Sequence, residues 1–418
     1  MTAHHEGERH PKHVVIIGAG QAGAELAFAV RQVSAYVMIT LIGAESHQPY
    51  QRPPLSKALL QGELTPRDVR VRSETAYATA RIELMLGNPV TRVDRVNSRL
   101  TLADGTSIRY DKLAFTTGGR PRTLDLGGDV EPALLLYSLD DAAALRAALA
   151  RRGRVIIVGG GFIGLEVAAA AVVAGCEVVV VETQTRLLAR ASAVQIGRHF
   201  ERLHRERGVD LRLGTSVDSA YVPPSGGVAL LLSDGSEVRA DHLLAGIGQL
   251  PNDELARECG LVVDGGIVVD EYAQTSDPAV VAAGDCTRQR HGFLNQVVRL
   301  ESQQNATDQA RIAARTLVER PHGTACAPWF WSDQYSQKLQ MVGVPRVGDT
   351  EIVRGDPLSG SFTVLYLRSG TLVAVQAVDR PRDFAQGRKL VNTRAVVDAR
   401  RCANPELPLA DAFVPVVA

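Results

Sequence analysis

One short pattern occurs twice in the chain: an apolar run, a glycine-rich turn and a stretch of small residues at helical spacing. The copies are His13-Val-Val-Ile-Ile-Gly18-Ala-Gly20-Gln-Ala-Gly23 and Val155-Ile-Ile-Val-Gly159-Gly-Gly161-Phe-Ile-Gly164. Each copy predicts a buried parallel strand, a tight turn and a helix whose N-terminal amides bind a pyrophosphate. The first glycine makes the turn, the second lets the backbone approach the phosphate, and the third lets the helix pack on the strand. Two copies in the correct context predict an α/β protein with two dinucleotide-binding domains.

A second apolar strand follows each glycine turn, and an acidic residue follows each of these strands. In the second copy, residues 178–181 lead into Glu182. A carboxylate at this position accepts hydrogen bonds from both ribose hydroxyls and repels a 2′-phosphate, which favours NADH over NADPH. A glutamate that is merely exposed at a strand end is the alternative, and Arg186 and Arg190 nearby could weaken the preference. In the first copy the acid arrives late, in Gly43-Ala44-Glu45, where a solvated loop carboxylate is the alternative to a ribose contact.

Two later segments, residues 111–121 and 241–252, also mirror each other, because each follows a hairpin with an Asp-Gly turn and opens into a glycine turn. They indicate where the chain crosses between nested domains. We therefore expect a discontinuous outer domain (12–120 and 246–325), an inner domain (121–245) and a C-terminal domain (326–418). Alternating apolar stretches and a basic stretch in the last segment predict a small antiparallel sheet and a helix over residues 383–401.

Composition excludes several classes of protein. The 46 basic and 46 acidic residues cancel, which argues against strong attraction to nucleic acid or an anionic membrane. No apolar run reaches the roughly 18–20 residues of a membrane helix. The first thirteen residues lack the hydrophobic core of a signal peptide, so we expect a cytoplasmic protein.

The five cysteines lie far apart, which argues against a metal site, an iron–sulfur cluster and a redox-active disulfide. Electrons that pass through this protein must therefore use an organic cofactor. Lysine is scarce in the chain, so Lys57, which lies inside a motif, is especially informative.

Four further blocks carry a resemblance to a known family. They are Pro49-Tyr-Gln-Arg52-Pro-Pro-Leu-Ser-Lys57, Ala283-Gly284-Asp285-Cys286, Arg299-Leu-Glu301-Ser302-Gln-Gln-Asn305 and Pro328-Trp-Phe-Trp-Ser-Asp-Gln-Tyr335. Together they resemble the FAD-dependent, NADH-using ferredoxin reductases of the putidaredoxin-reductase type, over residues 13–400. The resemblance implies two nested Rossmann-like domains of the glutathione-reductase type, the outer binding FAD and the inner binding NADH, and a small α+β C-terminal domain. A hydride would pass from NADH to FAD, and single electrons would then pass to a [2Fe–2S] ferredoxin that serves a cytochrome P450 or a Rieske oxygenase.

The resemblance also implies roles for individual residues. Lys57 would lie near the flavin N5, and Glu166 would face the nicotinamide pocket and pair with Lys57. The alternatives are a surface lysine and an acid that is favoured by the dipole in the first turn of a helix. Asp285 would contact the ribitol, with a turn cap as the alternative, while Trp331 would lie beside the isoalloxazine and Trp329 in the core. The implied FAD contacts are Gly18, Gly20, Ala22, Gly23, Ala44, Glu45, Arg52, Lys57, Val90, Thr117, Gly118, Asp285, Gln303 and Trp331. The implied NADH contacts are Gly159, Gly161, Ile163, Gly164, Glu166, Glu182, Arg190 and Gly248.

The sequence departs from the family pattern at three places. Ala44 stands where an acid is usual, Tyr137 replaces an arginine, and Asp379-Arg380-Pro381 replaces Asn-Arg-Pro. These departures put detailed FAD contacts in doubt, but not FAD binding.

The resemblance further implies docking of an acidic ferredoxin on a local basic patch, and neither nucleic acid nor membrane is an expected partner. Candidates for the patch, each of which could simply be solvated, are Arg288, Arg290, Arg315, Arg388 and Lys389. Rubredoxin, monodehydroascorbate or oxygen as the acceptor is the nearest alternative. Residues 43–52 lack the reactive cysteine of the related oxidases, which argues against an oxidase. A flavoprotein that only binds or signals would need a strongly basic surface, and the zero net charge argues against that alternative.

Overall fold

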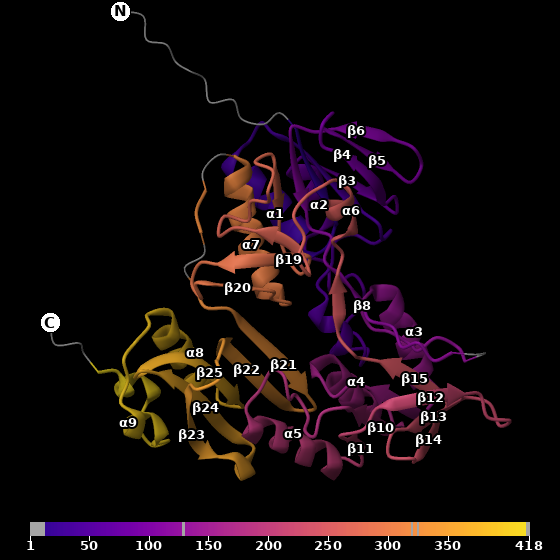
Figure 1. The fold of residues 1–418 in the computed structure, drawn as a ribbon, viewed down its shortest axis with the longest axis vertical. Helices are drawn as coiled ribbons and strands as arrows, with labels where there is room; N and C mark the ends of the chain where they lie inside the picture. Colours follow the sequence, from indigo (N-terminus) through magenta and orange to yellow (C-terminus); the bar gives the residue numbers. More distant parts are fainter. Residues whose placement is uncertain (1–12, 128–129, 319–320, 324–325, 415–418) are drawn as a thin grey trace, which may run out of the picture. The chain divides into compact units, whose positions relative to one another are not determined.

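The computed structural model describes residues 13–127, 130–318, 321–323 and 326–414, and its contacts divide the chain into two units (Figure 1). The first unit is Met1–Gln51, Val69–Arg120 and Leu250–Ala325, and the second is Arg52–Asp68, Pro121–Gln249 and Cys326–Ala418. Residues 1–12, which carry most of the signal-peptide argument, lie outside the described residues. No helix within the described ranges is long and apolar enough to cross a membrane. The predicted division into three domains stays a prediction.

A five-stranded parallel sheet organises the first unit, in the order β18-β7-β1-β2-β3. The strands are β1 (His13–Ile17), β2 (Met38–Gly43), β3 (Ile82–Leu86), β7 (Lys112–Phe115) and β18 (Val280–Ala282). Helices α1 (Gln21–Val33) and α7 (Gln303–Leu317) pack together in this unit, where α2 (Glu74–Thr79) and α6 (Glu254–Glu258) also lie.

The β1 strand is apolar on both faces because both faces are covered. Val14 and Ile16 share a core cluster with residues of α1 and α7. Val15 and Ile17 pack in another cluster with residues of an antiparallel sheet. That sheet is β4 (Val90–Asp94), β5 (Arg99–Leu102) and β6 (Ser107–Arg109), and a third sheet is β17 (Ile267–Val269), β19 (Thr287–His291) and β20 (Gln296–Val298).

The second unit contains the same arrangement again, which confirms the predicted α/β fold and the duplication. Its parallel sheet has the order β11-β10-β9-β15. The strands are β9 (Arg154–Val158), β10 (Glu177–Glu182), β11 (Asp210–Leu213) and β15 (His242–Ala245). The helices are α3 (Leu139–Ala150), α4 (Phe162–Val173) and α5 (Val194–Glu206), and the adjoining antiparallel sheet is β12 (Val217–Tyr221), β13 (Val228–Leu232) and β14 (Glu237–Ala240). Both predicted Asp-Gly hairpins are present, as β5–β6 and β13–β14.

The two predicted crossing segments pair with each other. They form the two-stranded sheet β8 (Gly119–Pro121) and β16 (Gln249–Pro251).

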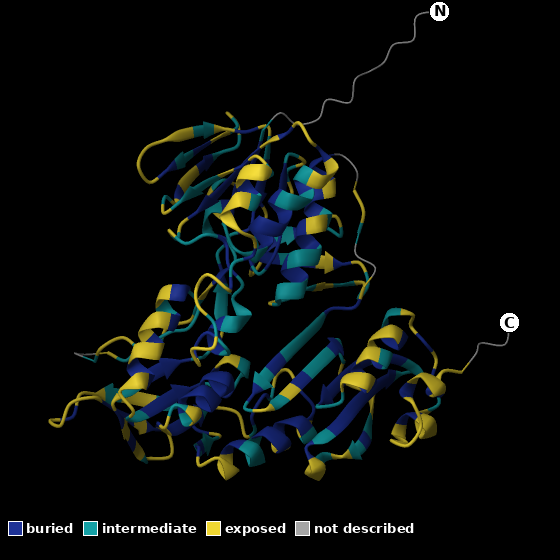
Figure 2. Ribbon diagram, turned by 180° about the vertical axis from the view of Figure 1, so that it is seen from behind, coloured by how far each residue is buried: buried dark blue, intermediate teal, exposed yellow. Residues whose placement is uncertain are grey.

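The C-terminal part of the second unit is the predicted antiparallel sheet, in the order β21-β22-β25-β24-β23. Its central strands are buried (Figure 2). The strands are β21 (Trp329–Gln334), β22 (Gln337–Gly343), β23 (Thr350–Asp356), β24 (Ser361–Arg368) and β25 (Thr371–Val378). Two short 3-10 helices, η2 (Pro357–Ser359) and η3 (Leu409–Ala412), lie in this part of the unit. A third, η1 (Pro53–Ser56), lies in the segment Arg52–Asp68 of the same unit.

The single helix expected over residues 383–401 is wrong. The segment forms α8 (Pro381–Asn392) and α9 (Ala399–Ala403). Between them, Val396 and Val397 bridge to Thr371 and Phe413 in extended conformation, which interrupts the helix.

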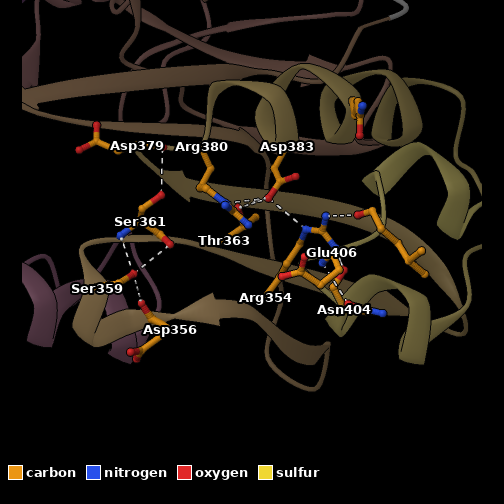
Figure 3. Close-up of polar contacts among 12 residues, drawn as sticks. Arg354, Asp356, Ser359, Ser361, Thr363, Asp379, Arg380, Asp383, Asn404 and Glu406 are labelled. Carbon is orange, nitrogen blue, oxygen red and sulfur yellow. Dashed lines mark hydrogen bonds and ion pairs between the residues drawn. The ribbon is translucent and has the colours of Figure 1, made fainter.

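A buried arginine attaches the last segment to the sheet (Figure 3). The Arg354 side chain is 2% exposed and its Nε donates to Asp383 Oδ2 at 3.0 Å. Its other nitrogens donate to the backbone carbonyls of Cys402, Asn404 and Leu407. Arg380 also donates to Asp383, at 3.2 Å, so the unusual Asp379-Arg380-Pro381 segment takes part in this structural cluster.

Candidate functional site

The three glycines of the first turn have the different surroundings that a dinucleotide site requires. Gly18 has φ +110°, and a Cβ there would lie 2.2 Å from the Thr116 carbonyl oxygen. A Cβ on Gly23 would lie 2.0 Å from the Gly18 carbonyl oxygen, whereas a Cβ on Gly20 would meet nothing within 4 Å. Packing within the protein thus requires the first and third glycines, and the second faces free space beside the start of α1. This cradle fits the pyrophosphate of FAD.

The second turn repeats this geometry. A Cβ on Gly159 would lie 2.4 Å from the Gly246 carbonyl oxygen, and one on Gly164 would lie 2.1 Å from the Gly159 carbonyl oxygen. A Cβ on Gly161 would again meet nothing within 4 Å. Ile163, in the first turn of α4, is 44% exposed although it is apolar. The second turn therefore also fits a dinucleotide.

In the first unit, the predicted FAD residues gather at the carboxyl ends of the parallel strands. The Gly18 amide donates to the Ile42 carbonyl at 2.7 Å, which places the glycine turn beside the end of β2. Ala44 and Glu45 follow directly, and Tyr50 donates to Glu45 Oε2 at 2.6 Å. The connection that leads to Val90 runs beside this loop, because the Gly87 amide donates to the Glu45 carbonyl at 3.0 Å. Ligands of open α/β sheets bind at this edge.

The remaining FAD candidates of this unit come from the other strands and from α7. Thr117 and Gly118 follow β7, and the Thr117 hydroxyl donates to the Asn252 carbonyl at 2.5 Å. Asp285 follows β18, and a Cβ on the preceding Gly284 would lie 3.1 Å from Cβ of Ala22. Gln303, the first residue of α7, donates from Nε2 to Gln51 Oε1 at 3.0 Å. The first residues of α1 and α7 thus approach each other, since Gln303 Nε2 is also 3.4 Å from Gln21 Oε1.

Three predicted FAD residues, Arg52, Lys57 and Trp331, belong to the second unit. The Arg52 guanidinium lies over the Tyr137 ring, 4.0 Å from its centroid, and donates to the Tyr137 carbonyl. Tyr137, which replaces the family's arginine, thereby contacts a predicted cofactor residue. The FAD roles of these three residues stay predictions.

Glu182 lies at the end of β10, against the second glycine turn. Its carboxylate accepts from the Gly160 amide and from the Gln184 amide, each at 2.7 Å. The Arg186 guanidinium donates to the carbonyls of Ala189 and Ser192 and is thereby held in its own loop. Arg190 is exposed, and Gly248 follows β15. This geometry fits the ribose position that was predicted for Glu182.

The second unit joins Lys57 to Glu166. Lys57 Nζ donates to Glu166 Oε2 at 2.6 Å, and the side chains are 15% and 1% exposed. Helix α4 begins at Phe162, so Glu166 lies in its second turn and is buried. The alternatives of a surface lysine and of a first-turn acid are therefore both wrong. A buried carboxylate requires partners, and Lys57 is one of them.

Two serines that the sequence reasoning missed complete the surroundings of Glu166. Ser56 Oγ donates to Glu166 Oε2, and Ser332 Oγ donates to Glu166 Oε1 at 2.6 Å. Both serines lie inside the blocks that carried the resemblance, which is the only signal that pointed to them. The Glu166 carboxylate therefore receives hydrogen bonds from the Lys57 segment and from β21.

The aromatic residues of β21 differ from expectation in one respect. Trp329 and Trp331 stack with ring centroids 5.5 Å apart, and Arg388 lies over Trp329 at 5.0 Å. Trp329 is only partly buried, so its predicted core position is wrong. Trp329 lies two residues from Trp331 and therefore on the same face of the strand. The Trp331 ring and the Arg388 guanidinium partly cover it there.

The five cysteines are free thiols. All five lie in the described part of the chain, and none is paired in a disulfide. Cys286, next to Asp285, is fully buried, and burial raises the pKa of its thiol to about 11, so it stays protonated and unreactive. Within the described residues, no group of three His, Cys, Asp or Glu could hold a metal ion.

Comparisons with known proteins agree with this geometry. Residues 12–310 match the pyridine nucleotide-disulphide oxidoreductase family, and residues 329–413 match the reductase C-terminal family. The chain is 40% identical over 408 residues to putidaredoxin reductase of Pseudomonas putida, spanning 95% of this chain and 96% of that protein. It is 43% identical over 399 residues to the ferredoxin–NAD(+) reductase component of the anthranilate 1,2-dioxygenase system of Burkholderia cepacia, spanning 94% and 98%.

Solved structures give the same result. The structure is similar to the covalent putidaredoxin reductase–putidaredoxin complex, with a TM-score of 0.92 and 40% identity over 96% of this chain and 98% of that chain. It is also similar to the ferredoxin reductase for the CYP199A2 system of Rhodopseudomonas palustris, with a TM-score of 0.92 and 36% identity over 96% and 100%. The predicted resemblance is confirmed, and the chain belongs to the pyridine nucleotide-disulphide oxidoreductase family.

Proposed function

We propose that this protein is an FAD-containing, NADH-dependent ferredoxin reductase that supplies electrons to a cytochrome P450 or a Rieske oxygenase. The observation that carries the proposal is the pair of glycine turns, each with its middle glycine facing free space. Similarity to named ferredoxin reductases over about 95% of the chain supports the choice of acceptor. In this proposal residues 12–120 and 246–325 bind FAD, residues 121–245 bind NADH, and residues 326–418 form the C-terminal domain.

A bound FAD would supply the chemistry that couples a two-electron hydride donor, NADH, to a one-electron acceptor. The chain's own residues provide binding, orientation and charge. The free amides at the starts of α1 and α4 bind the two pyrophosphates, and Glu182 selects NADH by accepting from the adenosine ribose. Lys57 keeps a positive charge at the reacting end, and Glu166 fixes its position through the 2.6 Å ion pair.

The partner in this proposal is a [2Fe–2S] ferredoxin with an acidic face, which docks on exposed arginine and lysine side chains. The chain's net charge is zero, so the attraction must come from a local group of charges. Arg290, Arg315, Arg388 and Lys389 are exposed, whereas Arg288 is engaged in an ion pair with Asp264 at 2.7 Å. The free cysteines fit a reducing compartment, and we place the enzyme in the cytoplasm.

Anaerobic mixing tests the proposal. The yellow protein is mixed with NADH or with NADPH while flavin absorbance is followed, and a panel of [2Fe–2S] ferredoxins is then added. We expect NADH to bleach the flavin faster than NADPH at equal concentration, and at least one ferredoxin to be reduced faster than oxygen or small quinones. Bleached flavin with no ferredoxin reduced faster than those small acceptors would contradict the assigned acceptor and favour the rubredoxin or monodehydroascorbate alternative.

A further inference from the structure

Strand β21 presents two buried polar side chains on one face. Ser332 and Gln334 are both 0% exposed, and they alternate with the partly exposed Trp331 and Asp333. Gln334 Nε2 donates to Ser332 Oγ at 3.4 Å, and Ser332 Oγ donates to Glu166 Oε1 at 2.6 Å. The strand that carries Trp331 on one face thus binds the Glu166 carboxylate with the other.

Beyond Gln334, the series of hydrogen bonds continues into α5. His204 is 0% exposed, its Nε2 lies 2.9 Å from Gln334 Oε1, and its Nδ1 lies 3.2 Å from the Tyr335 hydroxyl. The Arg207 guanidinium lies over the Tyr335 ring, 5.0 Å from its centroid. Burial lowers the pKa of His204 to about 4, so the ring is neutral near pH 7 and carries one N–H.

The hydrogen bonds that lead from Tyr335 to Glu166 can be donated in one direction only. The Glu166 carboxylate, paired with Lys57, accepts only, so the single Ser332 hydroxyl hydrogen points to it. Ser332 Oγ must then accept from the amide nitrogen of Gln334, which turns the amide oxygen toward His204. His204 Nε2 therefore carries the hydrogen, and its Nδ1 accepts from the Tyr335 hydroxyl. Every bond donates toward Glu166.

We propose that Tyr335, His204, Gln334 and Ser332 form a directed series of hydrogen bonds that holds the Glu166 carboxylate aligned with Lys57. Ser332 and Gln334 are accordingly positioning residues for reduction of the flavin by NADH. This inference rests on the proposed function, because the reaction in question is the reduction of the flavin by NADH. The series is not a proton path, because an amide that donates from its nitrogen and accepts at its oxygen does not relay a proton between its neighbours.

The charged and polar groups that face Glu166 are few. Lys57 and Ser56 come from the segment around η1, and Ser332 comes from β21. Among the residues that the structure describes, Ser332 is the one partner of Glu166 that connects the carboxylate, through Gln334, to a second helix. Such a network fixes one geometry when every member has a partner, and charge-assisted bonds to a buried carboxylate are its strongest members.

The direction is tested in the unmodified holoenzyme by ¹⁵N NMR of labelled histidine. The two ring nitrogens of a neutral histidine are distinguishable, and a His204→Gln variant assigns the signal. We expect His204 to be the neutral Nε2–H form at pH 7. An Nδ1–H form or an imidazolium at that pH would overturn the proposal, and this measurement requires neither ferredoxin nor catalysis.

The consequence for Glu166 is tested with Gln334→Glu, because a carboxylate there accepts from both His204 and Ser332 and draws the Ser332 hydrogen away from Glu166. We expect the limiting rate of flavin reduction by NADH to fall about tenfold, with the NADH dissociation constant changed less than threefold. Gln337→Glu is the matched control. Gln337 pairs with His199 of the same helix but has no contact with Glu166, so we expect its rate to stay within twofold.

Ser332→Ala is the second variant, and Ser332→Thr, which keeps the hydroxyl, should restore the rate that the alanine loses. If Gln334→Glu does not fold, the comparison of Ser332→Ala with Ser332→Thr and the NMR measurement still test the proposal. Equal rates in Ser332→Ala and the unmodified enzyme, or equal losses in the Gln334 and Gln337 variants, would overturn the proposal. Flavin reduction by NADH comes before electron transfer to the acceptor. A protein that reduces no ferredoxin could therefore still satisfy this test, so the two proposals can fail separately.

Discussion

At the scale of single residues, the glycines of each turn meet different physical demands. Gly161 has φ −83° and ψ −176°, a conformation open to any residue, and a Cβ there would meet no protein atom within 4 Å. Packing within the protein therefore does not require a glycine at this position. Gly164 is required by the protein itself, because its Cβ would lie 2.1 Å from a backbone oxygen.

We expect Gly161→Ala to fold normally and to raise the dissociation constant for NADH about tenfold, since the methyl group occupies the space that the backbone leaves for a phosphate. Titration of the oxidised enzyme with NAD⁺ and thermal melting measure the two properties. Gly164→Ala is the contrast and should lower the melting temperature or prevent folding. A Gly161→Ala protein with unchanged affinity would show that this turn does not hold the nucleotide.

Glu182 provides a second prediction at this scale. In the proposed function the Glu182 carboxylate accepts from the ribose and repels a 2′-phosphate, so Glu182→Ala should lower the preference for NADH over NADPH at least tenfold. The ratio of kcat/KM values for the two nucleotides measures this change. Glu177→Ala is the control, because Glu177 begins the same strand with its side chain 83% exposed. An unchanged preference in Glu182→Ala would contradict the assignment.

At the scale of elements, the sequence was most informative where a periodic pattern meets a glycine turn. The β1–α1–β2 and β9–α4–β10 units and the paired hairpins could be predicted, because each has a local signature. The surroundings of Glu166 could not, since Ser56 and Ser332 lie 110 and 166 residues away along the chain. Packing of α4 against η1 brings Ser56 to Glu166, and packing of α4 against β21 brings Ser332 there. Nothing in the local sequence around Gln334 or His204 indicates this register.

Helix α5 joins the C-terminal sheet through neutral histidines, which makes stability depend on pH. Burial lowers the pKa of His204 from 6.5 to about 4. Burial also lowers the pKa of His199, on the same helix, and the pKa of His291, on β19. The unfolded chain then binds more protons than the folded chain between about pH 6.5 and pH 4. The free energy of unfolding should therefore fall as pH falls through this window, by about 2 kcal/mol at pH 5 from His204 alone.

Urea unfolding at pH 7.5 and pH 5, followed by tryptophan fluorescence, measures this loss. Both tryptophans lie in β21, beside Gln334, so the probe reports on the relevant contact. His204→Gln keeps a donor toward Gln334 and removes the titrating group, and it should lose about 2 kcal/mol less than the unmodified protein. Parallel losses in the two proteins would mean that His204 is not held neutral.

At the scale of the whole molecule, a chain with equal numbers of positive and negative residues has no net field to attract an acidic partner. Any attraction must be local and short-ranged, and it must weaken with salt over a Debye length of about 8–10 Å. Arg388 and Lys389 are exposed neighbours on α8, and Arg388 lies over Trp329, whose ring stacks on Trp331. They are therefore charged residues near Trp329, which stacks on the Trp331 that the resemblance places beside the flavin.

We expect reversal of both charges, in Arg388→Glu with Lys389→Glu, to raise the KM for ferredoxin about tenfold or more and to reduce its dependence on salt. The rate with NADH and a small neutral acceptor should change less than twofold, because that reaction does not use the docking surface. Arg400→Glu is the matched control: it reverses an exposed charge on α9, which packs on β23, the edge of the sheet opposite β21. Steady-state kinetics at several salt concentrations separate the outcomes. A KM that rises equally in the control would indicate a general loss of positive charge, whereas an unchanged KM in the double variant would move the docking surface to Arg290 and Arg315.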